Sequence, residues 1–542
     1  MKYLAYCISI ACFLPVAKAG QINVSPTVEL GVHSGSVKSP NENLDRDGLV
    51  YSSKISTDIK YETKKTTSSL NYKWTKYKYN DELSNDSDYQ DFKLSTSIDV
   101  WRDDLVFKFS INRYHDLLDV IQGNFSDEIY DEETQVKKTR RIYTAKYVLP
   151  DVHDFDLNLT LDHEGNSASS KNDLRSVDFS EGYEVKRAFL NFGDFEKTKS
   201  LYWKFTAELE DQKRQSLSST TERDYDAIVR FPLIPNVRLV GTASSSEFST
   251  SNINFSDSTN EQKTETLGVG LAWVRDQDGS YLQATINTNQ ETNERTVGAE
   301  ISWEVADKIR LEYSREEEFF GRRNTASIDY FGDKNRFSFN LLEGVDYRYA
   351  TVVKQENLGF YICSSDENGD FEFDENLCYL PESGNQEIGQ GEALLPNIVT
   401  TFPIEVRLSK ERRYSASWSF ESGNWTHSVS ASKTTQRDLD REFEEESSFA
   451  SFHGEQRLNQ KSYVSFDWKF RDIEINREQA KSSEVLYSTG YHYELNTRAE
   501  WSLKAQFINK KTPNNSFDYE EARLSFNYKH HFGDKHRERR TF

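Results

Sequence analysis

Charged side chains occupy every second position along several stretches whose intervening positions are apolar. At the clearest of these stretches the polar positions hold Lys93, Asp99, Lys108, Lys204, Glu208, Glu300, Glu304, Arg310, Glu312, Asp467, Lys469 and Lys504. Six are cations and six are carboxylates, so the set has no excess of one sign that would focus a field on an anionic substrate. Opposite charges on neighbouring strands can also simply pair with one another. We predict that these twelve residues line a polar interior.

Two cysteines remain in the chain once its N-terminal segment, which contains Cys7 and Cys12, is set aside. Cys363 and Cys378 lie 15 positions apart in one polar stretch. In an exported protein such a pair is expected to form a disulfide. The acidic run 366–374 between them lacks the ligand order of an EF-hand calcium loop, so an exposed, disulfide-closed loop is the default interpretation.

Acidic residues gather in long polar segments, around positions 81–91, 127–133 and 438–446. Several carboxylates together can bind Ca²⁺ and, through it, an anionic lipid surface, whereas the simpler interpretation is solubilising charge. No other cofactor and no resident metal site is predicted. The net charge of -22 argues against nucleic acid as a partner, because phosphate contacts require a basic surface.

Motifs that would indicate an enzyme are missing from the sequence. There is no nucleophile elbow, no zinc-protease motif and no glycine-rich phosphate loop. The adjacent His530 and His531 would face opposite sides of a strand. We therefore do not expect an enzyme.

The elements that position these residues are strands, because the apolar ladders have a period of two. Examples are Phe92 to Val100, Leu267 to Trp273, Val297 to Val305, Val464 to Phe470 and Trp501 to Phe507. Several ladders place a tryptophan near a strand end, where an aromatic ring suits the membrane interface. Helical periodicity is not sustained anywhere in the chain.

Short and long connectors alternate between the ladders. Short ones lie near positions 64–65, 102–104, 232–236, 306–308 and 494–497, and long polar ones cover segments such as 114–138, 164–182, 249–264, 343–410 and 434–458. Short turns at one end and long loops at the other are typical of an outer-membrane β-barrel. We predict one antiparallel transmembrane barrel of about 24 strands, within a range of 20 to 26, in the outer membrane of a Gram-negative bacterium. Ile404, Val406 and Leu408 could form a further strand, but we assign them to the large loop.

The chain has 542 residues and a mean hydropathy of -0.78, which for a soluble protein would suggest several domains. A lysine, an apolar stretch from Leu4 to Val16 and an A-x-A pattern predict a signal peptide over 1–19. The barrel is then expected over 20–532, with a large external loop at 343–410 and a basic tail at 533–542. No plug-sized domain precedes the first predicted strand, which disfavours a siderophore-type receptor.

The last ladder has Leu524, Phe526, Tyr528 and Phe532 on one face. It resembles the C-terminal aromatic signature by which bacterial barrels are recognised by their assembly machinery. We expect that machinery, outer-membrane lipid and lipopolysaccharide as partners.

The run Ile22 to Leu30, the ladder Leu49 to Tyr61 and the segment Leu70 to Trp74 resemble the opening of a family of uncharacterised outer-membrane barrels. Residues Phe319 to Asn324 and Leu342 to Val345 resemble a later region of that family. The family accompanies the PEP-CTERM/exosortase sorting system and exopolysaccharide loci. The resemblance implies a role in exporting or anchoring a surface polysaccharide, with the polysaccharide and export-system components as partners, and carries over no catalytic residue.

Our hypothesis is a barrel that serves as a passive route or anchoring wall for a polysaccharide. One alternative is a general diffusion porin, for which the loop 343–410 could form the constriction. Another is a structural or adhesive barrel that conducts nothing.

Overall fold

The computed structural model describes residues 20–38, 46–80, 86–101, 104–117, 135–152, 155–170, 182–194, 201–214, 219–250, 261–275, 280–318, 321–351, 354–364, 378–379, 392–401, 404–439, 444–475, 480–511 and 518–532. The predicted signal peptide and the basic tail lie outside these residues. No helix in the described part of the chain has the length and apolar character needed to cross a membrane.

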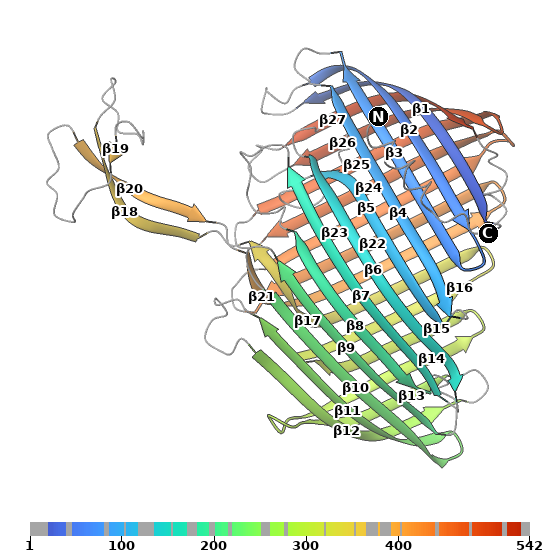
Figure 1. The fold of residues 1–542 in the computed structure, drawn as a ribbon, viewed down its shortest axis with the longest axis vertical. Coiled ribbons are helices and arrows are strands. Elements are labelled where there is room, and N and C mark those ends of the chain that lie inside the picture. The colour runs from blue at the N-terminus through green and yellow to red at the C-terminus, as the bar shows by residue number, and fades with distance from the viewer. Residues whose placement is uncertain are drawn as a thin grey trace. The chain divides into compact units, whose positions relative to one another are not determined.

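A 24-stranded antiparallel sheet contains most of the described residues (Figure 1). Its strands are β1 (Gln21–Lys38), β2 (Arg46–Glu62), β3 (Thr66–Tyr79), β4 (Ser87–Trp101), β5 (Leu105–Leu117), β6 (Gln135–Val152), β7 (Phe155–Ser170), β8 (Tyr183–Gly193), β9 (Tyr202–Arg214), β10 (Ser219–Ile234), β11 (Val237–Thr250), β12 (Glu261–Val274), β13 (Tyr281–Asn289), β14 (Arg295–Ala306), β15 (Ile309–Glu318), β16 (Gly321–Phe331), β17 (Asn335–Thr351), β21 (Ile404–Ser422), β22 (Trp425–Asp438), β23 (Glu444–Arg457), β24 (Ser462–Ile475), β25 (Ala480–Asn496), β26 (Ala499–Lys511) and β27 (Tyr519–His531). The strand number confirms the expected architecture.

The sheet is closed, because the first strand pairs with the last. β1 and β27 are antiparallel over a register that runs from Thr27 opposite His531 to Lys38 opposite Glu520. Closure leaves no edge strand, so every ladder position has a neighbour on both sides. The side chain of His33 crosses this seam and contacts Ser525 at 2.8 Å and Ser52 at 2.9 Å.

Tight turns connect the strands at one end of the barrel. Asn236 (φ 65°) and Gly423 (φ 57°) have the left-handed backbone conformation that two such turns require. The Asn496 side chain accepts hydrogen bonds from the backbone N–H groups of Arg498 at 2.8 Å and Ala499 at 2.9 Å. The first residue of β1, Gln21, and the last residue of β27, His531, both lie at this turn end.

The assignment of Ile404, Val406 and Leu408 to the large loop is wrong, because β21 begins at Ile404. The predicted long connector 434–458 is also wrong, since β22 continues to Asp438 and β23 begins at Glu444. At the distal ends of β22 and β23 both faces carry polar residues, so pairing continues after the apolar alternation has stopped.

The expected loop 343–410 is therefore shorter, since β17 extends to Thr351 and β21 begins at Ile404. The described residues between Tyr347 and Arg407 belong to a separate compact unit. Its described part is a three-stranded sheet of β18 (Lys354–Ser364), β19 (Cys378–Tyr379) and β20 (Glu392–Thr401). The register places Cys363 opposite Cys378, a spacing that suits a disulfide. Their side chains lie outside the described set, so the bond stays a prediction.

Candidate functional site on the inner wall of the barrel

The two faces of the closed sheet are distinguished by a contact between distant strands. Arg230 on β10 lies 3.4 Å from a carboxylate oxygen of Glu300 on β14. On a flat sheet these strands would be about 19 Å apart, at about 4.8 Å per strand. The contact must therefore cross the concave side, and Arg230 marks the inner face. Its neighbours Val229 and Phe231 point outward.

The outer face is apolar over a band that begins at the turn end. On β14 the outward positions are Val305, Trp303, Ile301, Ala299 and Val297, and Arg295 follows at the distal end. This band covers nine residues, the length over which a tilted strand crosses the hydrocarbon layer. The fold is that of an outer-membrane β-barrel.

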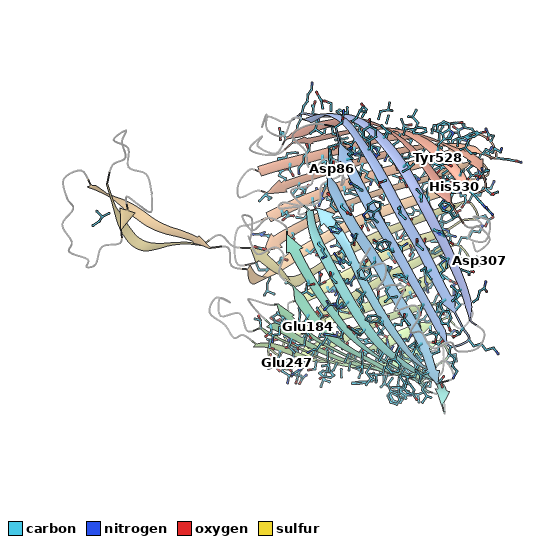
Figure 2. All side chains as sticks on the ribbon, turned by 45° about the horizontal axis from the view of Figure 1, so that its top comes forward. Asp86, Glu184, Glu247, Asp307, Tyr528 and His530 are labelled. Carbon is cyan, nitrogen blue, oxygen red and sulfur yellow. The ribbon has the colours of Figure 1, made fainter. Side chains whose placement is uncertain are left out.

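Aromatic rings border this apolar band at the turn end. Trp273 and Trp303 stack with ring centroids 5.4 Å apart, and the Arg275 guanidinium lies 5.2 Å from the Trp303 ring. Trp501 contacts Tyr493 at 5.9 Å and Phe526 at 6.1 Å. These groups match the aromatic girdle expected at a membrane interface. Figure 2 shows Tyr528, His530 and Asp307 toward this end, and Glu184 and Glu247 toward the other.

All twelve residues predicted to line the interior lie, by register, on the inner face. The structure brings some of them into contact: Glu304 is opposite Arg310, whose Nε lies 3.2 Å from Glu312. Others meet residues that the prediction did not name. Asp467 contacts Nδ1 of His453 at 2.6 Å and accepts a hydrogen bond from Ser488 at 3.0 Å. The remaining members, Lys93, Asp99, Lys108, Lys204, Glu208, Lys469 and Lys504, are distributed around the wall.

A ladder of charge pairs crosses the inner face of β6 to β9. Arg140 donates two hydrogen bonds to Glu164, at 2.7 and 2.9 Å, and Tyr183 donates a third at 2.9 Å. Arg187 then links Glu164, at 3.9 Å, to Glu210, at 2.6 Å. Charge is thus neutralised locally along this part of the wall.

A buried cluster connects β9, β10, β13 and β14 across the concave inner face of the wall. The Arg230 side chain is 1% exposed and lies between the rings of Tyr202 and Tyr281, at 4.8 and 4.9 Å. Its Nε donates to Gln283 at 2.9 Å, and the Tyr281 hydroxyl donates to Glu300. The sequence analysis missed Arg230, although its position between Val229 and Phe231 places it on the polar face of an alternating strand.

Glycines on β12 make this concave curvature possible. A Cβ on Gly268 would overlap the side chains of Asn287 and Thr242, which lie on the strands to either side. These two side chains meet across β12, where the Thr242 hydroxyl donates to Asn287 at 3.3 Å. The inner face therefore has no room for side chains on β12 here.

Hydroxyl groups pair across the strands at several places on the inner face. Oxygen–oxygen distances are 2.6 to 2.7 Å in the pairs Ser69–Ser95, Ser244–Thr266, Ser314–Thr325 and Ser430–Ser451. A groove of about 330 Å³ adjoins the last of these pairs. Its lining combines the polar residues Asp329, Arg336, Ser338, Ser417, Ser419, Ser428 and Ser430 with the apolar residues Phe331, Phe337, Trp418 and Val429.

The described residues contain no group of three or more His, Cys, Asp or Glu side chains arranged to hold a metal ion. Much of the acidic sequence on which the calcium expectation rests, including 81–85, 118–134 and 440–443, lies outside those residues. The calcium interpretation stays a prediction.

No family model and no curated protein matches the chain. Among solved structures, the FrpB iron transporter from Neisseria meningitidis is similar, with a TM-score of 0.44 and 10% identity over 93% of this chain and 81% of that one. The siderophore receptor PirA from Acinetobacter baumannii has a TM-score of 0.39 and 8% identity over 95% and 81%. The copper transporter OprC has a TM-score of 0.42 and 8% identity over 95% and 81%.

Proposed function

We propose that the barrel provides a hydroxyl-lined route across the outer membrane for a polysaccharide of low net charge. The observation that carries the proposal is the set of paired serine and threonine hydroxyls on the inner wall, together with the serine-lined groove. Hydroxyls can exchange hydrogen bonds with a passing sugar at little net cost, because donor and acceptor roles are interchangeable.

The electrostatics of the wall support the same cargo. The carboxylates of Glu164 and Asp467 are each held by a neighbouring basic group, and Arg310 pairs with Glu312. A wall neutralised in this way does not select strongly for one sign of charge. The resemblance to barrels of exopolysaccharide loci implies the same role.

The size of the barrel is compatible with a polymer. A closed sheet of 24 strands, at about 4.8 Å per strand and a tilt of about 40°, has a circumference of about 150 Å. Side chains of the wall alone do not fill so large a ring.

Permeability of proteoliposomes tests the proposal. We expect vesicles with the refolded barrel to take up neutral oligosaccharides faster than protein-free vesicles, and Ser430→Trp to slow that uptake by filling the groove. Val297→Trp is the control, because Val297 points outward from β14, does not line the groove and is 55% exposed.

Equal uptake with and without the barrel would refute a passage. In the native host, deletion of the gene is expected to reduce surface polysaccharide. An unchanged amount, with permeability intact in vesicles, would instead favour the diffusion-porin alternative.

A further inference from the structure

Outward-facing cations gather at the distal margin of the apolar band on β15 to β21. Arg315 and Arg322 belong to β15 and β16, and Lys410 and Arg412 belong to β21. In the strand register, Arg315 lies opposite Ala299 on one side and Asn324 on the other, and Asn324 lies opposite Glu343. All four residues therefore share the outward face. The four cations and Glu343 are called the basic patch below.

One carboxylate of the basic patch contacts two of its cations. Glu343 contacts Lys410 at 2.9 Å and Arg412 at 2.7 Å through the same oxygen. Within the described part of the chain, neither Arg315 nor Arg322 has an ion-pair partner, and Arg315 Nε is buried without a hydrogen bond. The register also places Glu317 of β15 opposite Arg322 on this outward face, so four cations stand against two carboxylates and the net charge here is about +2.

At other places on the distal outer wall a cation has a carboxylate partner, although Arg113, Lys137 and Arg141 on β5 and β6 form a second group of outward cations. Arg223 pairs with Glu247 at 3.1 Å, and Lys433 pairs with Glu446 at 2.6 Å. On β25, Lys481 pairs with Asp472 at 3.0 Å.

Exposed apolar side chains adjoin the basic patch on the turn side. On β16, Ile328 is 42% exposed, and Tyr414 and Trp418 on β21 are each 37% exposed. They belong to the band that faces hydrocarbon, so the basic patch lies where a lipid changes from acyl chains to headgroup.

We propose that the basic patch binds the phosphate groups of a phosphorylated glycolipid of the external leaflet, the lipid A part of lipopolysaccharide, whose acyl chains lie along the apolar band. Guanidinium groups suit phosphate because they donate two parallel hydrogen bonds. The surplus of cations over carboxylates beside exposed apolar side chains is what favours an anionic headgroup here.

Binding of lipid A to the refolded full-length barrel in detergent, measured by native mass spectrometry or thermophoresis, tests this inference. We expect Arg322→Ala combined with Arg412→Ala to weaken binding roughly 30-fold, from about 1 kcal/mol per basic residue at a membrane surface. The double variant Arg223→Ala and Lys481→Ala removes the same charge from paired sites on strands away from the basic patch and is expected to change binding less than 3-fold.

Two further variants separate binding from folding. Arg322→Lys with Arg412→Lys keeps the charge and is expected to recover most of the affinity, whereas Glu343→Gln releases two cations and is expected to tighten binding. A purely structural role for the basic patch gives no such gain. Dephosphorylated lipid A is expected to bind at least 10-fold more weakly. Equal binding of both lipids, or equal affinity of the Arg322/Arg412 alanine variant and the native chain, would overturn the proposal.

Discussion

Replacement of Arg230 by methionine tests whether the buried cluster fastens the concave wall of the barrel. The substitution keeps much of the side-chain volume and removes the charge. It deletes the hydrogen bond to Gln283, the ion pair with Glu300 and the contacts with two tyrosine rings.

Breaking a buried ion pair by removing one partner costs about 3–5 kcal/mol. Glu300 keeps a side-chain exposure of 33%, so water would solvate part of its freed charge. We therefore expect a loss of about 3 kcal/mol in the free energy of unfolding. The control is Arg223→Met, whose ion pair with Glu247 is exposed and contributes less than about 1 kcal/mol.

Reversible urea unfolding in lipid vesicles, followed by tryptophan fluorescence, gives both free energies. Arg230→Met combined with Glu300→Gln also removes the Glu300 carboxylate that is left without its ion-pair partner. This double variant is expected to be about 1–2 kcal/mol more stable than Arg230→Met alone. If Arg230→Met and Arg223→Met unfold within 1 kcal/mol of each other, the cluster does not fasten the wall.

Three other outcomes follow from particular positions. Gly270→Ala is expected to lower the free energy of unfolding by about 1–3 kcal/mol, because its Cβ would overlap a backbone carbonyl of the next strand, whereas Gly241→Ala, with open space around its Cβ, should be neutral in the same urea titration. In the turns, a hydrogen bond and charge attraction lower the pKa of Asp333 and raise that of Lys308. The native chain should therefore be more stable than Asp333→Asn by a constant amount between about pH 5 and 9, and this difference in stability should disappear as the pH falls through the lowered pKa of Asp333 or rises through the raised pKa of Lys308. Equal melting temperatures of the two chains at neutral pH would contradict this. The two cysteines of the small sheet should give a gel band that migrates faster before than after reduction, and a chain that reacts fully with a thiol reagent without reduction would contradict the disulfide.

Strand existence and the sidedness of each ladder were predictable from the sequence because the alternation is local. Lys93 and Asp99, for example, are on the face opposite Leu94 and Ile98, and no tertiary contact is needed to infer it. The strand number followed from the same pattern.

Strand ends were harder to predict, for a reason that lies in the membrane. Beyond the apolar band the outward residues are polar, as with Lys433 and Glu446, so the period-two signal disappears while backbone pairing persists. The error over the connector 434–458 came from this loss of signal, whereas Ile404, Val406 and Leu408 still alternate with polar residues.

Composition and alternation alone therefore determined that the chain forms a closed sheet with an apolar outside and a polar inside, since lipid on one face and water on the other impose that pattern residue by residue. Only the tertiary structure decided which polar residues meet. Arg230 and Glu300 are 70 residues apart in sequence. The basic patch likewise brings together residues of β15, β16 and β21, although the sequence of the small separate sheet lies between β17 and β21. Such contacts depend on the register and curvature of a whole barrel, which no local segment encodes.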